Sequence, residues 1–177
     1  MLIYLLGWAA PKRREHMEAI KKIMVAIDLS EYSRDILKYA GTLAKSIKSE
    51  LIIVNVINNR DIEALQKAAM ETDAFSVKEW LRREKEKRQG LIEGLIEETG
   101  CNHLPNKIVF REGVPFRELL KTVDEEGANL VALGAKGRSN VPGELVGSTA
   151  EKMCRRCPVP ILSLRSPIHK KVLQTGR

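Results

Sequence analysis

Leu51-Ile52-Ile53-Val54-Asn55-Val56-Ile57 is the stretch that decides the fold class. Six of its seven residues are aliphatic, and apolar and polar residues do not alternate along it, as they do in a strand with one face in water. A continuous apolar run that ends in turn-forming residues, here Asn58 and Asn59, is typical of a strand buried on both faces. Four more runs share this pattern: residues 23–27, 107–110, 130–133 and 159–164.

Helical patterns separate these runs. After Asp28, apolar residues recur three and four positions apart, and Ser30 is the expected N-cap because its hydroxyl can accept a first-turn amide. Residues 62–99 are predicted to be largely helical with a break near Thr72, and further helices are expected from Pro115 and over residues 148–156. Because parallel strands require crossover helices, this alternation predicts an α/β fold, an open five-stranded parallel sheet with helices on both faces.

Composition and charge narrow the class of protein. The chain has 177 residues, of which 44% are hydrophobic and 30% charged, enough apolar material for one core and too much for a disordered chain. Three cysteines favour a reducing compartment, so a cytoplasmic location is expected, and no apolar run reaches the roughly 18 residues that a membrane span needs. The net charge of +7 is confined to the end of the chain, which argues against a nucleic-acid-binding face.

The chain is expected to divide into three parts. Residues 1–18 form an N-terminal extension in which an apolar stretch precedes the basic Lys12-Arg13-Arg14, the reverse of the order in a signal peptide. This extension has three open interpretations: translation from an early start with Met17 the true beginning, an interfacial anchor, or an extra element packed on the domain. Residues 19–166 form the domain, and residues 167–177 form a basic tail.

The loop after the fourth apolar run carries the chemistry. Ligands of open parallel sheets bind at the carboxyl ends of strands, where Gly134-Ala135-Lys136-Gly137 follows residues 130–133 here. Glycines allow tight bends whose N–H groups converge, and Gly147-Ser148-Thr149 adds the amides and positive dipole of a helix N-terminus, which favour phosphate. Lys136 and Arg138 supply positive charge. The alternative is that the glycines serve only the turn and that residues 148–151 form a capping box.

Two common nucleotide motifs do not occur in the sequence. Neither the Walker pattern Gly-x4-Gly-Lys-Ser/Thr nor the dinucleotide pattern Gly-x-Gly-x-x-Gly is present, so P-loop catalysis and hydride transfer lack support.

The glycine spacing instead resembles a known signature. Gly134-x2-Gly137-x9-Gly147-Ser148 is similar to the nucleotide-binding signature of the universal stress protein family, and the resemblance extends over about residues 19–166. It implies a Rossmann-like sheet in the order 3-2-1-4-5, as in adenine nucleotide alpha hydrolases, and a homodimer through the last strand, Val159–Leu164. It also implies that the chain belongs to the branch that keeps the signature and binds ATP or AMP, with Mg²⁺ or Mn²⁺ accompanying the nucleotide.

The resemblance also implies roles for individual residues. Asp28 would contact the adenosine part and the backbone near Val56 would flank adenine, while the glycine bends hold the phosphates. The full set of expected nucleotide-binding residues is Asp28, Ser30, Val56, Gly134, Lys136, Gly137, Arg138, Gly147, Ser148 and Thr149. Ala135, Lys136 and Pro142-Gly143 depart from residues common in relatives, which leaves ATP or AMP open.

The implied function is a nucleotide-dependent sensor or regulator in the stress response. The alternatives are an interaction module in which nucleotide binding is incidental, and a slow ATP hydrolase. No catalytic residue is expected, because Asp28 is the acid that can be placed near the site and its simpler role is to bond a ribose hydroxyl.

Two further patterns have structural interpretations. Cys154 and Cys157 end a helix before Pro158, where the dipole has the opposite sign to the one that activates a thiol, so a structural role is favoured over redox or zinc chemistry. Glu84 and Arg88, one helical turn apart, suit a solvent-exposed helix face.

Overall fold

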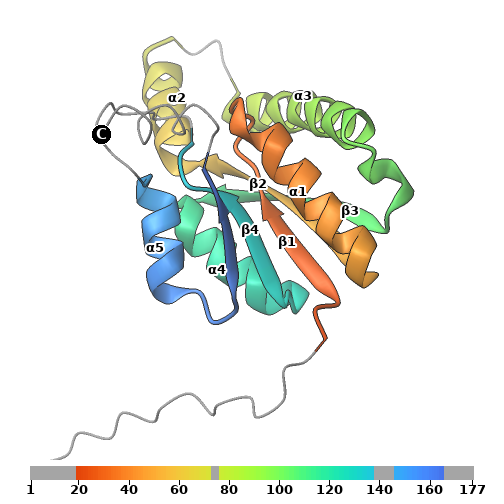
Figure 1. Cartoon of the computed structure of the whole chain (residues 1–177). Helices are drawn as coiled ribbons and strands as arrows, with labels where there is room; N and C mark the ends of the chain where they lie inside the picture. Colours follow the sequence, from red (N-terminus) through yellow and green to blue (C-terminus); the bar gives the residue numbers. More distant parts are fainter. Residues whose placement is uncertain (1–18, 73–75, 138–145, 166–177) are drawn as a thin grey trace, which may run out of the picture.

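A computed structural model describes residues 19–72, 76–137 and 146–165 of the chain. Its centre is one parallel sheet whose strands lie in the order β3-β2-β1-β4-β5, as predicted (Figure 1). The strands are β1 (Lys22–Ala26), β2 (Glu50–Asn58), β3 (Asn106–Gly113), β4 (Leu130–Gly134) and β5 (Ile161–Leu164). The chain runs outward from β1 to β3 and then returns to β4 beside β1, so the strand order reverses between β1 and β4.

Helices cover both faces of the sheet. They are α1 (Tyr32–Ile47), α2 (Asn59–Thr72), α3 (Val77–Glu98), the 3₁₀ turn η1 (Cys101–His103), α4 (Pro115–Glu126) and α5 (Ser148–Arg156). α1 and α3 pack on one face and α4 and α5 on the other, while α2 stands beyond the carboxyl end of β2 (Figure 1). None of the helices in the described segments is long and apolar enough to cross a bilayer.

The core consists of two apolar layers that share the strands. Along β1, Ile23 and Val25 pack beneath α1 and α3, and Met24 packs beneath α4 and α5; all three are fully buried. Successive side chains of a strand point to opposite faces, so a strand that is buried on both faces has no polar alternation. This explains why residues 51–57 are apolar at every position except Asn55.

Proline and glycine residues mark the ends of α3 and α4. Pro115 occupies the first turn of α4, where its missing N–H has no intrahelical partner to lose. Gly100 follows α3 with φ 71°, and Gly127 ends α4 with φ 63°. Both glycines adopt the left-handed conformation that closes a helix and that side chains with a Cβ disfavour.

The prediction for the exposed face of α3 is wrong at one residue. Arg88 is 7% exposed and lies against the sheet, together with Ile92 and Ile96. The sequence spacing of Glu84 and Arg88 correctly predicts an ion pair, at 2.7 Å, but does not indicate which face of the helix carries it.

The outer edge of β3 is bordered by charged side chains. Each is paired with a helix on one side or the other: Lys107 with Glu126, Arg111 with Glu125, and Glu112 with Lys85. Charged side chains along an edge strand oppose the addition of a further strand. The opposite edge, β5, has the half-buried apolar Ile161, Leu162 and Leu164 and the exposed Ser163.

Candidate functional site

A cleft of 480 Å³ opens at the carboxyl edge of the sheet, where the strand order reverses. In doubly wound sheets this switch point is where ligands bind, because the loops of neighbouring strands diverge there. Aliphatic side chains form one part of its lining: Ala26, Ile36, Val54, Val56, Leu119 and Leu133. The remaining lining comes from the turn after β1, the bends after β4, and the first turns of α2, α4 and α5.

Asp28 supplies a carboxylate to the cleft directly after β1. Its Oδ1 accepts hydrogen bonds from the Ser30 N–H at 3.0 Å and from the Ser33 hydroxyl at 3.3 Å. These bonds close a turn in which Leu29 has φ 61°, a left-handed conformation that is uncommon for a residue with a Cβ. These two local hydrogen bonds therefore fix the orientation of the Asp28 carboxylate.

Ser30 does not act as predicted at the start of α1. The helix begins at Tyr32 with Glu31 as N-cap and no side-chain cap, and the Ser30 hydroxyl is buried without a hydrogen-bond partner within the described segments. Its backbone N–H binds Asp28 instead, and Ser30 is not among the residues that line the cleft. The Ser33 N–H, which an N-cap hydroxyl on Ser30 could accept, donates to the Ser30 backbone carbonyl at 3.0 Å instead.

The two glycine bends lie against each other. Gly147 N–H donates to the Ala135 carbonyl at 2.7 Å, and a Cβ on Gly147 would lie 3.7 Å from the Lys136 Cα. A Cβ on Gly134 would lie 2.7 Å from the Lys136 carbonyl oxygen, so only glycine fits the first bend without a shift. The bends therefore converge at the cleft, as the spacing predicts.

Gly137 lies against the carboxylate of Asp28. A Cβ at this position would lie 2.4 Å from Asp28 Oδ2, closer than real Cβ contacts. The absence of a side chain therefore lets the bend after β4 approach the turn after β1. This contact between the two bends of the switch point is a feature that the sequence pattern does not reveal.

The start of α5 leaves its first amides uncapped by any side chain. The N-cap is Gly147, and no side-chain capping bond forms, so the capping-box interpretation of residues 148–151 is wrong. Ser148 and Thr149 line the cleft at this helix N-terminus, where unpaired N–H groups and the helix dipole favour an anion. Half-buried Lys136 adds a positive charge, whereas Arg138 and Pro142-Gly143 lie outside the described residues.

Sequence reasoning missed the contribution of α2. Asn58, Arg60 and Asp61 line the cleft because α2 begins at Asn59, three residues before the predicted start of the helix. The Asn58 side chain accepts the Arg60 N–H at 3.1 Å, in the manner of a helix cap. The sequence signal for this earlier helix start was an asparagine at the end of the strand, Asn58, followed by an acid, Asp61, in the first turn of the helix.

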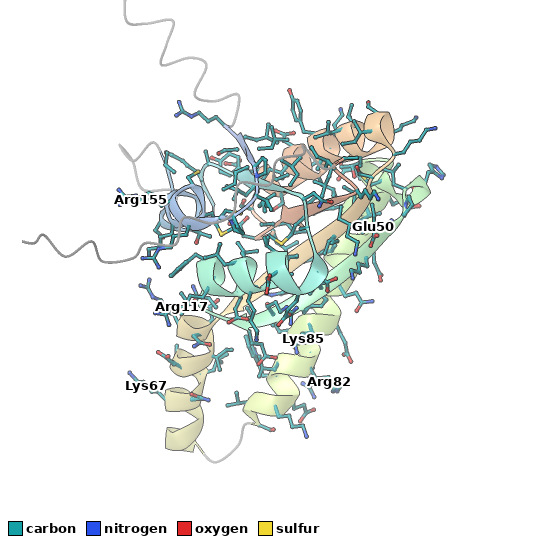
Figure 2. The ribbon with its side chains drawn as sticks, turned by 90° about the horizontal axis from the view of Figure 1, so that it is seen from below. Glu50, Lys67, Arg82, Lys85, Arg117 and Arg155 are labelled. Atoms are coloured by element: carbon teal, nitrogen blue, oxygen red, sulfur yellow. The ribbon has the colours of Figure 1, made fainter. Side chains whose placement is uncertain are left out.

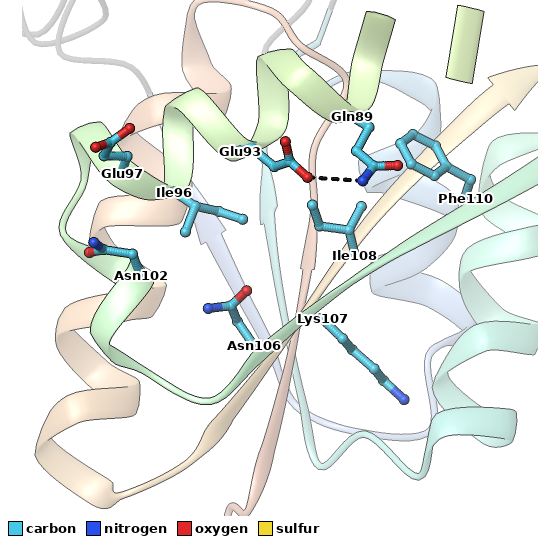
Figure 3. A pocket seen from close by; sticks show the side chains of 9 residues that line it. All are labelled: Gln89, Glu93, Ile96, Glu97, Asn102, Asn106, Lys107, Ile108 and Phe110. Carbon is cyan, nitrogen blue, oxygen red and sulfur yellow. Dashed lines mark hydrogen bonds between the residues drawn. The ribbon is translucent and has the colours of Figure 1, made fainter. Parts of the chain in front are cut away.

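A second hollow, of 560 Å³, lies between α3 and β3 (Figure 3). Glu93 and Ile96 of α3 line it together with Asn106 and Ile108 of β3, and Glu93 already accepts a hydrogen bond from Gln89 at 2.9 Å. It runs along the outer edge of the sheet, away from the carboxyl ends of β1 and β4, and no glycine bend lines it. The cleft at the switch point is therefore the candidate functional site.

The described residues do not form a metal cage of their own. Across the three described segments, no group of three or more His, Cys, Asp or Glu side chains gathers as a protein-held ion requires. A divalent ion that accompanies a nucleotide would take its ligands chiefly from phosphate and water.

The universal stress protein family model matches residues 19–165, most of the chain. The chain belongs to the universal stress protein family. Among curated members, MJ0531 of Methanocaldococcus jannaschii is 25% identical over 147 residues and 83% of each chain. The Bacillus subtilis member YxiE is 29% identical over 149 residues, covering 81% of this chain and 98% of its own.

Solved structures of other family members share the fold. The structure of MJ0577 from M. jannaschii has a TM-score of 0.69 at 23% identity, over 84% of this chain and 98% of that one. A universal stress protein in complex with cAMP has a TM-score of 0.55 at 20% identity, over 84% and 98% of the two chains. An Archaeoglobus fulgidus member in complex with dAMP has a TM-score of 0.55 at 12% identity, over 82% and 98%.

Proposed function

We propose that this universal stress protein binds an adenine nucleotide, ATP or AMP, in the cleft and acts as a nucleotide-dependent sensor or regulator of a stress response. The observation that carries the proposal is the convergence of two glycine bends and an uncapped helix N-terminus at the switch point. Such amides form a preorganised anion site. The cAMP and dAMP complexes of other family members agree with this ligand class.

Each part of an adenine nucleotide has a matching group in the cleft. The phosphates suit the amides near Gly137 and at the start of α5, with the Ser148 and Thr149 hydroxyls and Lys136 beside them. The Asp28 carboxylate is an acceptor for a ribose hydroxyl, and the aliphatic surface near Val56 suits the base. The cleft volume falls within the roughly 300–1,000 Å³ range of small-ligand sites.

A binding role fits the cleft better than rapid hydrolysis does. Asp28 and Asp61 are the carboxylates among the described lining residues, and Asp28 Oδ1 already accepts two hydrogen bonds. Hydrolysis needs a general base that is free to take a proton from an attacking water. We therefore propose slow turnover at most, with Mg²⁺ or Mn²⁺ bound through the nucleotide's phosphates.

Titration calorimetry with ATP and AMP, each with and without Mg²⁺, tests the proposal. Saturable binding of one nucleotide to one site per chain is expected, with Lys136→Ala weakening ATP more than AMP because the lysine attracts phosphate charge. Lys45→Ala is the matched control, because it removes the same charge from an exposed position of α1 that does not line the cleft. Failure of both nucleotides to bind would reject the function.

We further propose a homodimer that joins residues 159–164 of two copies. β5 is an edge strand, and its backbone bonds to β4 involve the carbonyls of Pro160 and Leu164. Backbone groups alternate in direction along a strand, so the Ser163 N–H points away from β4. Ser163→Pro removes this outward donor without touching the β4 ladder.

Sedimentation analysis tests this interface. The wild type and Ser163→Ala are expected to sediment as dimers, and Ser163→Pro as a folded monomer. A wild type that stays monomeric at every concentration would reject the interface.

Two further proposals concern the domain boundaries and the cellular location. We propose that residues 19–166 fold as one unit, with residues 1–18 and 167–177 as appendages, in line with the family match over residues 19–165. The three cysteines are free in the structure, which suits a reducing compartment, and we propose a cytoplasmic location.

A further inference from the structure

A polar residue lies fully buried in the apolar run of β2. Asn55 is 0% exposed, its Nδ2 donates to the Ile27 carbonyl at 2.9 Å, and its Oδ1 accepts from Arg88 Nη1 at 3.0 Å. Both ends of the amide are therefore bonded, as a buried polar group requires. The three residues connect α3, through β2, to the end of β1.

Arg88 is buried although its side chain is charged. Its Nε donates to Glu84 at 2.7 Å, and the two side chains are 9% and 20% exposed. Arg82 and Glu86 form a pair with the same spacing and the same 2.7 Å separation, but their side chains are 62% and 61% exposed. Figure 2 shows Arg82 on the first turns of α3, which extend beyond the sheet. The two pairs share their spacing and separation but run in opposite order along the helix, and they differ most in burial, so Arg82 is a control for the loss of an exposed ion pair.

The peptide at the end of this connection leads directly into the candidate site. The Ile27 N–H donates to the Val54 carbonyl at 3.0 Å and the Ile27 carbonyl accepts from Asn55, so β2 holds both sides of Ile27. The next residue is Asp28, followed by Leu29 with φ 61°. A shift of the Ile27–Asp28 peptide would therefore redirect the carboxylate that faces the cleft.

We propose that Arg88 is a positioning residue for nucleotide binding: through Asn55 it holds the Ile27–Asp28 peptide and so couples α3 to the cleft. The inference rests on the proposed function, because it assigns the effect to the carboxylate that contacts the nucleotide. Burying a guanidinium is unfavourable unless its donors are satisfied, so α3 occupies this position only while the connection to Asn55 is intact. By thermodynamic linkage, a nucleotide that fixes the position of Asp28 also stabilises the packing of α3 against the sheet.

Nucleotide affinity of substituted proteins gives the first test. Arg88→Met keeps the length and the apolar stem but removes every donor. It is expected to raise the dissociation constant for ATP about tenfold, less than loss of a whole charge-assisted bond, because the Asp28 carboxylate is misdirected rather than removed. Arg88→Lys retains one donor group and is expected to recover part of that loss. Arg82→Met is expected to bind ATP as the wild type does.

A double-mutant cycle separates positioning from general destabilisation. In an Asp28→Ala background, Arg88→Met is expected to change the dissociation constant less than twofold, because the group that it positions is gone. The same tenfold loss in both backgrounds would show that Arg88 acts only on the fold and would overturn the proposal.

Amide hydrogen exchange without nucleotide provides a readout that does not depend on binding. Arg88→Met is expected to speed exchange at the amides of residues 28–33 relative to Arg82→Met, and unchanged exchange there would overturn the proposal. If the wild type binds neither ATP nor AMP, the proposed function fails, and the exchange experiment still decides whether Arg88 holds the turn.

Discussion

Substitution of Gly137 by alanine tests the close approach of the two bends at the switch point. A Cβ at this position lies 2.4 Å from Asp28 Oδ2, whereas ordinary contact begins at 3.4 Å, so the carboxylate must withdraw by about 1 Å. Withdrawal strains the bonds from Ser30 and Ser33 that fix its direction. Loss of one charge-assisted bond to the ribose costs about 2 kcal/mol, or about 30-fold in the dissociation constant.

The backbone at Gly137 does not itself require glycine. Its φ is not among the positive values found at Gly100, Gly113 and Gly127, so alanine fits the conformation and the protein is expected to remain folded. Gly137→Val, which carries two methyl groups more than Gly137→Ala on the same Cβ, is expected to abolish measurable binding. The valine side chain would displace the Asp28 carboxylate as well as occupy the space proposed for phosphate.

Calorimetry with ATP and AMP measures the effect, and thermal unfolding of the same samples shows whether each variant is folded. Gly147→Ala is a useful comparison, because its Cβ would meet the Ala135 carbonyl at an ordinary 3.5 Å, and a smaller loss is expected. A folded Gly137→Ala protein that binds both nucleotides within twofold of the wild type would refute the steric argument.

Four further predictions concern packing and titration. Gly41→Ala places a Cβ 2.4 Å from Cys101 Sγ inside the core, so urea unfolding should show a loss of about 2 kcal/mol. Burial raises the pKa of the Cys157 thiol, so exposed Cys154 should be alkylated faster at pH 8, as peptide mass spectrometry would show. Because the folded state keeps the Cys157 proton longer than the unfolded chain, the free energy of unfolding should fall as pH rises above about 9, and Cys157→Ser should remove that part of the fall. Phe116→Leu removes a ring that three cations approach within 5.0–5.9 Å, and should cost about 1 kcal/mol in urea unfolding.

The sequence predicts the sheet well because burial on both faces leaves a direct trace in it. The five apolar runs became five strands, and the helical patterns between them became the crossovers, in the order that the family resemblance implied. The start of α2 was missed because residues 59–61 are polar and exposed or half-buried, and hydrophobic periodicity does not register such a turn.

Errors arose where two local rules compete or where distant segments meet. Ser30 satisfies the N-cap preference, but the turn held by Asp28 delays the start of α1 to Tyr32, and the Ser33 N–H donates to the Ser30 carbonyl rather than to its hydroxyl. Arg88 satisfies a surface ion-pair rule, yet its partner Asn55 lies in a strand far away in the sequence. A lone asparagine inside an apolar run was the trace of that contact, since a buried amide must find partners.

The unequal chemistry of the two sheet borders has a consequence for assembly. In the proposed dimer, the β5 edge strands of both copies pair with each other, so the two β3 strands become the outer edges of the joined sheet. On β3, Lys107, Arg111 and Glu112 form ion pairs with neighbouring helices. These charged β3 edges oppose the addition of a strand from a third copy. The proposed dimer would in this way be protected against polymerising into fibres as the protein concentration rises.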